Sequence, residues 1–195
     1  MSCLIALILL LVTAPSLFSA QEDAALEEFM RRLAPMAQHP RVEASFVQVR
    51  RFSAINFEMK TTGKMSAEPG KMILWETLTP ARSKCTMKGD SCTFWDEHSG
   101  KTTTLPAKEH PWVAMIFRLS NSWVSPDLKA LQKEFSITQQ DSHTLRLTPL
   151  SKGIADIFAS IQVTFSQDFS HVQQIVFTEK KGKDNDTITI DFQHK

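Results

Sequence analysis

The sequence predicts an α+β fold in which a curved antiparallel sheet forms an open, unclosed barrel, with helices as a lid over its concave face. Three features predict it: an amphipathic helix near the N-terminus, two runs of short β segments, and an amphipathic helical stretch between the runs. About ten strands in one sheet curl strongly, and the concave side is the economical place for the helices. A plain packed core fits the same pattern, because periodicity alone does not show a cavity.

The chain begins with an uncharged segment, residues 1–20, whose apolar run LIALILLLV is followed by small residues. This pattern is typical of a cleaved secretory signal, and the run is too short to span a bilayer. We expect cleavage after Ala20, with Ser16 as the alternative position and an uncleaved membrane anchor as the competing interpretation. The remaining residues, 21–195, are expected to form a single domain.

The first helix is predicted at residues 23–38. Asp23 is a suitable N-cap, and the apolar residues that follow recur at three- and four-residue spacing. Pro35 and then His39-Pro40 end the helical pattern, because proline removes a backbone donor and restricts the residue before it.

The first β run is predicted to contain six strands separated by turn signals. They cover residues 42–52, 55–61, 63–67, 72–78, 83–87 and 92–96. If Lys88-Gly89 is the two-residue turn of the last hairpin, Cys85 and Cys92 fall opposite each other. An oxidising compartment then favours a disulfide between them. No further Cys or His follows at the spacing of a zinc finger, so we expect no metal site here.

The second β run shows clean alternation, with one apolar face and one face toward water. Its strands are predicted at residues 135–139, 143–148, 160–167, 172–179 and 187–193.

Residues 106–134, between the two runs, are predicted to be helical. One apolar face is formed at i, i+3, i+4 and i+7 by Trp112, Met115, Ile116 and Leu119. Ser125-Pro126-Asp127 then gives a strong start to a second helix, with Ser as the N-cap and Pro at the first helical position.

Charge and motif content argue against nucleic-acid binding and catalysis. The formal net charge is +1, and basic residues are scattered among nearly as many acidic ones. The sequence has no nucleophile elbow, zinc-protease motif, glycine-rich phosphate loop or C-x-x-C pair, and its six histidines are dispersed. We therefore expect no enzyme activity, no cofactor and no metal. The 13 Phe and 8 Met, with no Tyr, suit contact with acyl chains more than with sugars.

Several short motifs then occur in a characteristic order. They are Ala44-Ser45-Phe46-Val47-Gln48, Gly63-Lys64-Met65, Glu68-Pro69-Gly70-Lys71, Met72-Ile73-Leu74-Trp75 and Leu78-Thr79-Pro80. In order and spacing they resemble the periplasmic outer-membrane lipoprotein carrier family, LolA and its relatives. The resemblance covers the chain from about residue 22 to residue 193 and is strongest between Val42 and Pro80.

This resemblance implies a periplasmic carrier with an open barrel closed by a helical lid around a hydrophobic cavity. Such a carrier takes an acylated lipoprotein, or a related envelope lipid, from an inner-membrane exporter to an outer-membrane acceptor, and we expect it to be a monomer. The family motif places Phe46, Met65, Ile73 and Trp75 on barrel strands as candidate lipid-binding residues. The lid candidates are Trp112, Met115, Ile116 and Leu119, and closed-core packing is the alternative for all eight.

Glu68 departs from the family pattern, in which a basic residue precedes the proline of the second motif and latches the lid. This departure leaves the cargo open between a lipoprotein and a glycolipid or other envelope lipid. Two further classes remain as rivals: a periplasmic sensor module built on the same half-barrel, and a lipid-modifying hydrolase.

Overall fold

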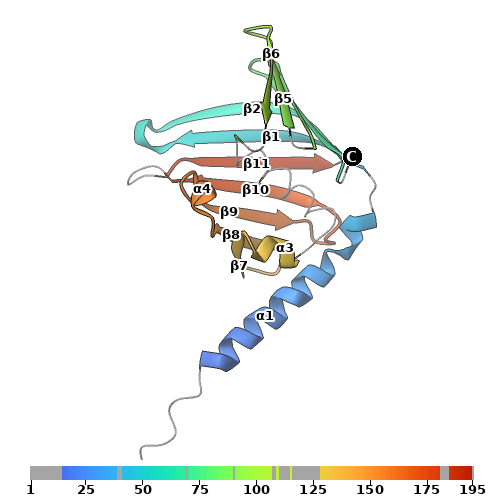
Figure 1. Ribbon diagram of the computed structural model, residues 1–195, viewed down its shortest axis with the longest axis vertical. Helices are drawn as coiled ribbons and strands as arrows, with labels where there is room; N and C mark the ends of the chain where they lie inside the picture. The colour runs from blue at the N-terminus through green and yellow to red at the C-terminus, as the bar shows by residue number, and fades with distance from the viewer. Residues whose placement is uncertain are drawn as a thin grey trace, which may run out of the picture.

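The fold is dominated by one antiparallel sheet of eleven strands (Figure 1). The computed structural model describes residues 15–38, 41–68, 70–89, 91–106, 109, 115, 128–180 and 185–194. The strands are β1 (Val42–Phe52), β2 (Phe57–Glu68), β3 (Met72–Thr79), β4 (Ser83–Lys88), β5 (Ser91–Asp96), β6 (Thr102–Pro106), β7 (Phe135–Gln139), β8 (Thr144–Pro149), β9 (Phe158–Phe165), β10 (Val172–Glu179) and β11 (Thr187–His194).

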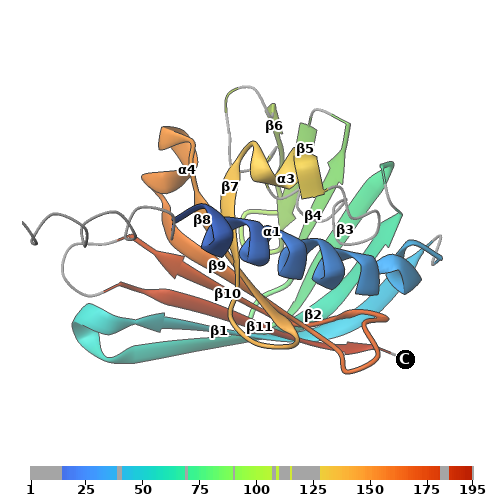
Figure 2. The same cartoon turned by 90° about the horizontal axis from the view of Figure 1, so that it is seen from below.

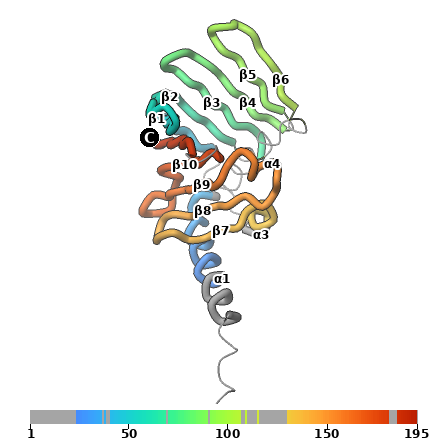
Figure 3. The backbone as a smooth tube through the Cα atoms, turned by 90° about the vertical axis from the view of Figure 1, so that its left-hand side faces the viewer, coloured from blue at the N-terminus to red at the C-terminus, as the bar shows by residue number. Residues whose placement is uncertain are grey.

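The strands form two meanders that meet in the middle of the sheet. The spatial order is β6-β5-β4-β3-β2-β1-β11-β10-β9-β8-β7, so the first strand pairs with the last one. Among the described residues β6 and β7 are the two edges and do not pair with each other, and the sheet curves between them without closing (Figure 3). This confirms the predicted open barrel.

The C-terminal part of the first helix, α1 (Pro15–Arg32), packs on the concave side of the sheet, and the helix extends past the β7 edge (Figure 1 and Figure 2). A short 3-10 helix, η1 (Ala34–Gln38), follows it and leads back to β1. Their buried side chains lie on one face at three- and four-residue spacing: Leu26, Phe29, Leu33 and Met36. Two shorter helices, α3 (Leu128–Gln132) and α4 (Lys152–Ala155), precede β7 and β9.

Two buried apolar clusters lie on the concave face. The larger one joins α1 and η1 to the C-terminal strands and to β1. The smaller one lies among β2 to β6 and consists of Ala67, Ile73, Met87 and Cys92, with Met65, Cys85 and Leu105 packed against it. Met65 contacts both clusters, so it marks the boundary between the two halves of the core.

Several element boundaries differ from the prediction. The helix begins at Pro15, not after an N-cap at Asp23, and it spans the expected cleavage position at Ala20. Proline suits the first helical position because its missing N–H would have no partner there. The α-helix gives way at Arg32 to the 3-10 turn η1, which contains Pro35.

The β pattern also needs two corrections. Residues 55–61 and 63–67 were expected as separate strands, yet β2 is continuous and residues 53–55 form the 3-10 turn η2 (Ser53–Ile55) before it. Strand β6 was missed, because its Thr102-Thr103-Thr104 run has high β propensity but no apolar alternation. The apolar run of the N-terminal segment and Ser125-Pro126-Asp127 lie outside the described residues.

Gly63 provides a test of the close packing at the centre of the sheet. A Cβ at this position would overlap the carbonyl oxygen of Glu76 and the ring of Phe46. We expect Gly63→Ala to lower the free energy of unfolding by about 1–3 kcal/mol, because overpacking forces backbone and side chains to move. Urea denaturation measures the change.

Gly153 is the matched control, since a Cβ there meets no atom within 4 Å and the residue lies in α4. Gly153→Ala should be neutral or stabilising by up to about 1 kcal/mol, because alanine favours helix. Equal unfolding midpoints for the two variants would contradict the packing described at Gly63.

Candidate functional site

The candidate site is an aromatic cluster on the concave face, where the two meanders meet. Strand register places Phe46 of β1 between Phe192 of β11 and Gly63 of β2. The next strand pair sets Met65 opposite Trp75 of β3. Because directly opposed residues in an antiparallel pair project to the same face, these side chains converge on one surface.

Ring geometry within this cluster is specific. Phe46 and Trp75 stack with ring centroids 4.0 Å apart and an interplanar angle of 27°. Phe192 meets Trp75 edge-on, with centroids 6.1 Å apart. The ring of Phe46 occupies the space that a side chain at residue 63 would take, so the missing Cβ of Gly63 permits the stack. Aromatic pairs of this kind contribute about 0.5–1.5 kcal/mol beyond area burial.

The structure brings most of the described candidate residues together. Phe46 and Met115 are buried in the larger cluster, and Met65 and Trp75 are half-buried against it. Ile73 is buried in the smaller cluster instead. The remaining lid candidates, Trp112, Ile116 and Leu119, lie outside the described residues.

Phe192 and Phe29 are members of the core that the sequence did not single out as site residues. Phe192 lies in the predicted strand 187–193, whose alternation places it on the apolar face with Ile188 and Ile190. Alternation predicts a buried face but not which of its residues belong to a site. Phe29 belongs to the helical stripe and packs edge-on against Phe165 and Phe169, at centroid distances of 5.7 Å and 5.5 Å.

The structure does not support the expected disulfide. Cys85 and Cys92 are free thiols with their sulfurs 2.8 Å apart. Lys88 pairs with Ser91, so the turn falls one residue later than expected. Cys92 therefore lies opposite Met87, and Cys85 lies opposite Phe94, which makes the two cysteines diagonal neighbours on one face. Burial, helped by the contact with Cys92, raises the pKa of Cys85 to about 12, so this group stays a thiol at neutral pH.

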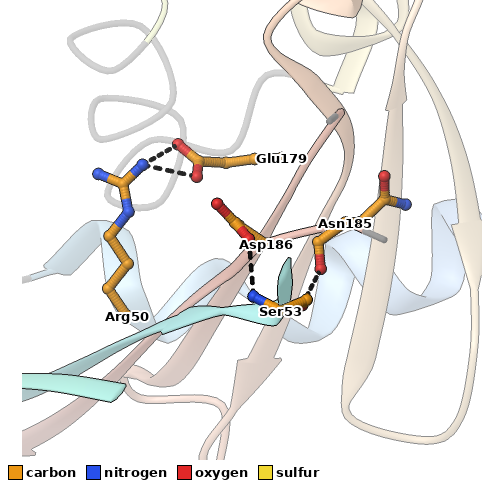
Figure 4. Close-up of polar contacts among 5 residues, drawn as sticks. All are labelled: Arg50, Ser53, Glu179, Asn185 and Asp186. Carbon is orange, nitrogen blue, oxygen red and sulfur yellow. Dashed lines mark hydrogen bonds and ion pairs between the residues drawn. The ribbon is translucent and has the colours of Figure 1, made fainter. Parts of the chain in front are cut away.

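Polar contacts fix the end of the β1–β2 hairpin against the neighbouring strands (Figure 4). The Arg50 guanidinium donates to both carboxylate oxygens of Glu179, with N–O distances of 2.7 Å and 3.0 Å. Ser53 donates its backbone N–H to Asp186 Oδ1 at 2.9 Å and its hydroxyl to the Asn185 carbonyl at 2.7 Å. The bonds of Arg50 join β1 to the end of β10, and those of Ser53 join the turn after β1 to the residues before β11.

Histidines occupy the other end of the concave face. The ring centroids of His171 and His194 lie 4.1 Å apart, and His194 Nε2 is 3.0 Å from the Val172 carbonyl oxygen. Burial lowers the pKa of His194, and the positive charge of a protonated His171 acts in the same direction. Across the described residues no group of three or more His, Cys, Asp or Glu side chains could hold a metal ion.

Glu68 lies near two basic groups at the turn between β2 and β3. Its carboxylate is 3.8 Å from Arg41 and 4.0 Å from Lys71. Ion pairs of this length between solvent-accessible groups contribute about 0–1 kcal/mol. In the described part of the chain, none of the helices is both long and apolar enough to cross a membrane.

Residues 38–195 match the family described as outer membrane lipoprotein carrier protein LolA. Among curated proteins no match is found. One similar solved structure is a DUF1329 family protein from Desulfovibrio piger, with 10% identity, TM-score 0.47, and coverage of 88% of this chain and 91% of the other.

Two further solved structures are similar at the same level. Lipoprotein LppX from Mycobacterium tuberculosis has 13% identity and TM-score 0.45, covering 88% of this chain and 94% of the other. A LolA superfamily protein from Nitrosomonas europaea has 9% identity and TM-score 0.43, covering 86% and 90%. Likenesses this distant carry no inference about function.

The lowered pKa of His194 makes stability depend on pH. An unfolded histidine titrates near pH 6.5, so below about that pH the unfolded chain binds a proton that folded His194 does not. The free energy of unfolding should therefore fall as pH is lowered from about 7 to about 5. His194→Gln should flatten this fall, measured by urea denaturation at several pH values. An unchanged pH slope in the variant would show that His194 is not the group responsible.

Proposed function

Because the chain belongs to the outer membrane lipoprotein carrier protein LolA family, we propose that it shields the acyl chains of a lipid-anchored cargo in the periplasm. The cargo is an acylated lipoprotein or a related envelope lipid, collected from an inner-membrane exporter and passed to an outer-membrane acceptor. The observation that carries the proposal is the family match over residues 38–195, supported by the aromatic cluster on the concave face.

Acyl-chain burial explains why such a cargo requires a carrier. Each buried methylene is worth about 0.8 kcal/mol, so an anchor with roughly 30 methylenes gains on the order of 20 kcal/mol. Free diffusion of the anchor through water is therefore negligible. A carrier must offer an apolar surface of comparable quality, and release must be an exchange between apolar sites.

The concave face has the chemistry that this task needs. Phe46, Trp75 and Phe192 offer large apolar rings, and Met65 adapts to irregular apolar shapes. We propose no enzymatic step and no cofactor.

A glycolipid is the alternative cargo. Glu68 is the reason for this alternative, because it stands where the family motif has a basic residue. Purification from a Gram-negative periplasm, followed by native mass spectrometry and lipid extraction, distinguishes the cases. Bound acylated peptide supports the lipoprotein carrier, and bound glycolipid supports the alternative. A lipid-free protein that also rejects an acylated probe contradicts both and favours a sensor module with a packed core.

Trp75 provides the sharpest test of the binding face. Trp75→Ala should weaken binding of a fluorescent fatty acid by roughly tenfold, equal to about 1.4 kcal/mol of lost apolar contact. Leu74→Ala is the matched control, because the neighbouring residue in β3 points to the opposite face of the sheet. Fluorescence titration gives both dissociation constants.

A different outcome would contradict this assignment. If Trp75→Ala binds the probe more tightly than the wild-type protein, the mutation has opened a cavity in a closed core. Equal affinities for the two variants would place the acyl chain elsewhere on the protein.

A further inference from the structure

The large apolar side chains that remain exposed gather at one end of the sheet. Seven such residues occur in the described part of the chain, and six of them lie where β1, β3 and β8 end and where β2 and β9 begin. We call these six the apolar rim: Ile55, Phe57, Met59, Leu78, Leu150 and Ile157. Antiparallel pairing brings these strand ends to the same side of the molecule.

The opposite end of the sheet differs in chemistry. Its turns are polar in sequence, with Gly70-Lys71, Lys88-Gly89, residues 140–143 and residues 166–171. The one large apolar residue among them, Phe169, is buried against α1. Residues 80–82 and 97–101 lie at the same end as the rim and are polar as well, so the exposed apolar residues are confined to the part of this end between β3 and β8.

The β1–β2 hairpin is the most prominent part of the rim. Ile55 is 71% exposed, Phe57 52% and Met59 36%. Pairing between β2 and β3 begins only at Thr62, so the hairpin projects past the end of β3 (Figure 2). Phe52 stacks on Phe57 with centroids 5.9 Å apart, which holds the exposed ring in place.

An ion pair and two hydrogen bonds hold this projecting hairpin against the neighbouring strands. The pair of Arg50 with Glu179, and the bonds from Ser53 to Asn185 and Asp186, fasten it to β10 and to the start of β11 (Figure 4). A supported apolar tip keeps its shape on contact with a partner and loses little conformational entropy.

Exposed charges around the hairpin favour an anionic partner. Among the described residues around the hairpin and Ile157, four basic side chains are exposed against two carboxylates, those of Glu58 and Asp156. The basic residues are Arg51, Lys60, Lys152 and Lys180. Lys180 lies beside the rim residue Ile157, whose carbonyl oxygen accepts a hydrogen bond from the Lys180 backbone. Apolar side chains flanked by cations are the combination that binds the interface of an anionic bilayer.

We propose that the apolar rim docks on the surface of an anionic phospholipid bilayer. Ile55 and Phe57 enter the boundary between headgroups and acyl chains, and Arg51, Lys60 and Lys180 contact the phosphates. This docking is independent of what the aromatic cluster binds, so it holds or fails separately from the proposed carrier function.

Vesicle flotation tests the proposal with phosphatidylglycerol vesicles and, for comparison, phosphatidylcholine vesicles. Phe57→Ser should lower the fraction bound to phosphatidylglycerol vesicles by about tenfold. Phe94→Ser is the matched control, because Phe94 is 38% exposed but lies within β5, away from the rim, and its binding should stay unchanged. Lys60→Gln should weaken binding to phosphatidylglycerol about fivefold and leave phosphatidylcholine unaffected.

The wild-type protein and all variants must begin at the same N-terminal residue, which intact-mass measurement determines. Any membrane affinity of the N-terminal segment then contributes equally to every sample. Unfolding midpoints confirm that each variant is folded. Equal flotation of Phe57→Ser and Phe94→Ser would overturn the proposal. The proposal would also be overturned if the protein does not bind vesicles and forms a dimer that Phe57→Ser dissociates. The apolar rim would then contact a second copy of the chain.

Discussion

The pairing of β1 with β11 is the interaction on which the rest of the structure depends. It joins two meanders that are otherwise separate. In its register Ala44 pairs with His194 at one end, and Arg51 pairs with Thr187 at the other. The same register sets Phe46 beside Phe192 and brings Arg50 and Ser53 near Glu179 and Asp186. A slip by one residue would move every side chain of β1 to the other face and would dissolve the aromatic cluster and the polar support together.

The position of α1 then makes the two halves of the sheet unequal. Because η1 leads directly from α1 into β1, the helix returns over the C-terminal strands, where Phe29 and Leu33 complete the larger cluster. Among the described residues of β2 to β6, Met65 and Trp75 pack against the larger cluster, and the buried residues around Ile73 and Met87 form the smaller one. Among the described residues, the aromatic cluster lies at the boundary between the larger and the smaller buried cluster.

Local patterns in the sequence predicted local structure well. The bounds of β1, β7 and β10 were predicted correctly, because alternation or a buried run over a few residues determines a strand by itself. The sheet order required the β1–β11 contact, which no local pattern contains, and the stack of Phe46 on Trp75 depends on the empty space at Gly63 one strand away. The hairpin register at Cys85 and Cys92 was wrong because Lys88-Gly89 and Gly89-Asp90 are both acceptable turns by composition. Gly89 has a positive φ of 56°, and only the pairing of Lys88 with Ser91 decides between them.

Strand β2 links the two surfaces for which functions are proposed. Alternate residues put Phe57, Met59, Thr61, Gly63 and Met65 on one face, so a single strand runs from the exposed hairpin tip to the aromatic cluster. Exposure falls along this line from Phe57 to Thr61, which is buried, and to Gly63 under the Phe46 ring. For a carrier docked at the rim, an acyl chain that follows this face leaves the bilayer a few methylenes at a time. Each methylene exchanges one apolar contact for another, at about 0.8 kcal/mol, so the full cost of exposing the anchor to water never arises at once.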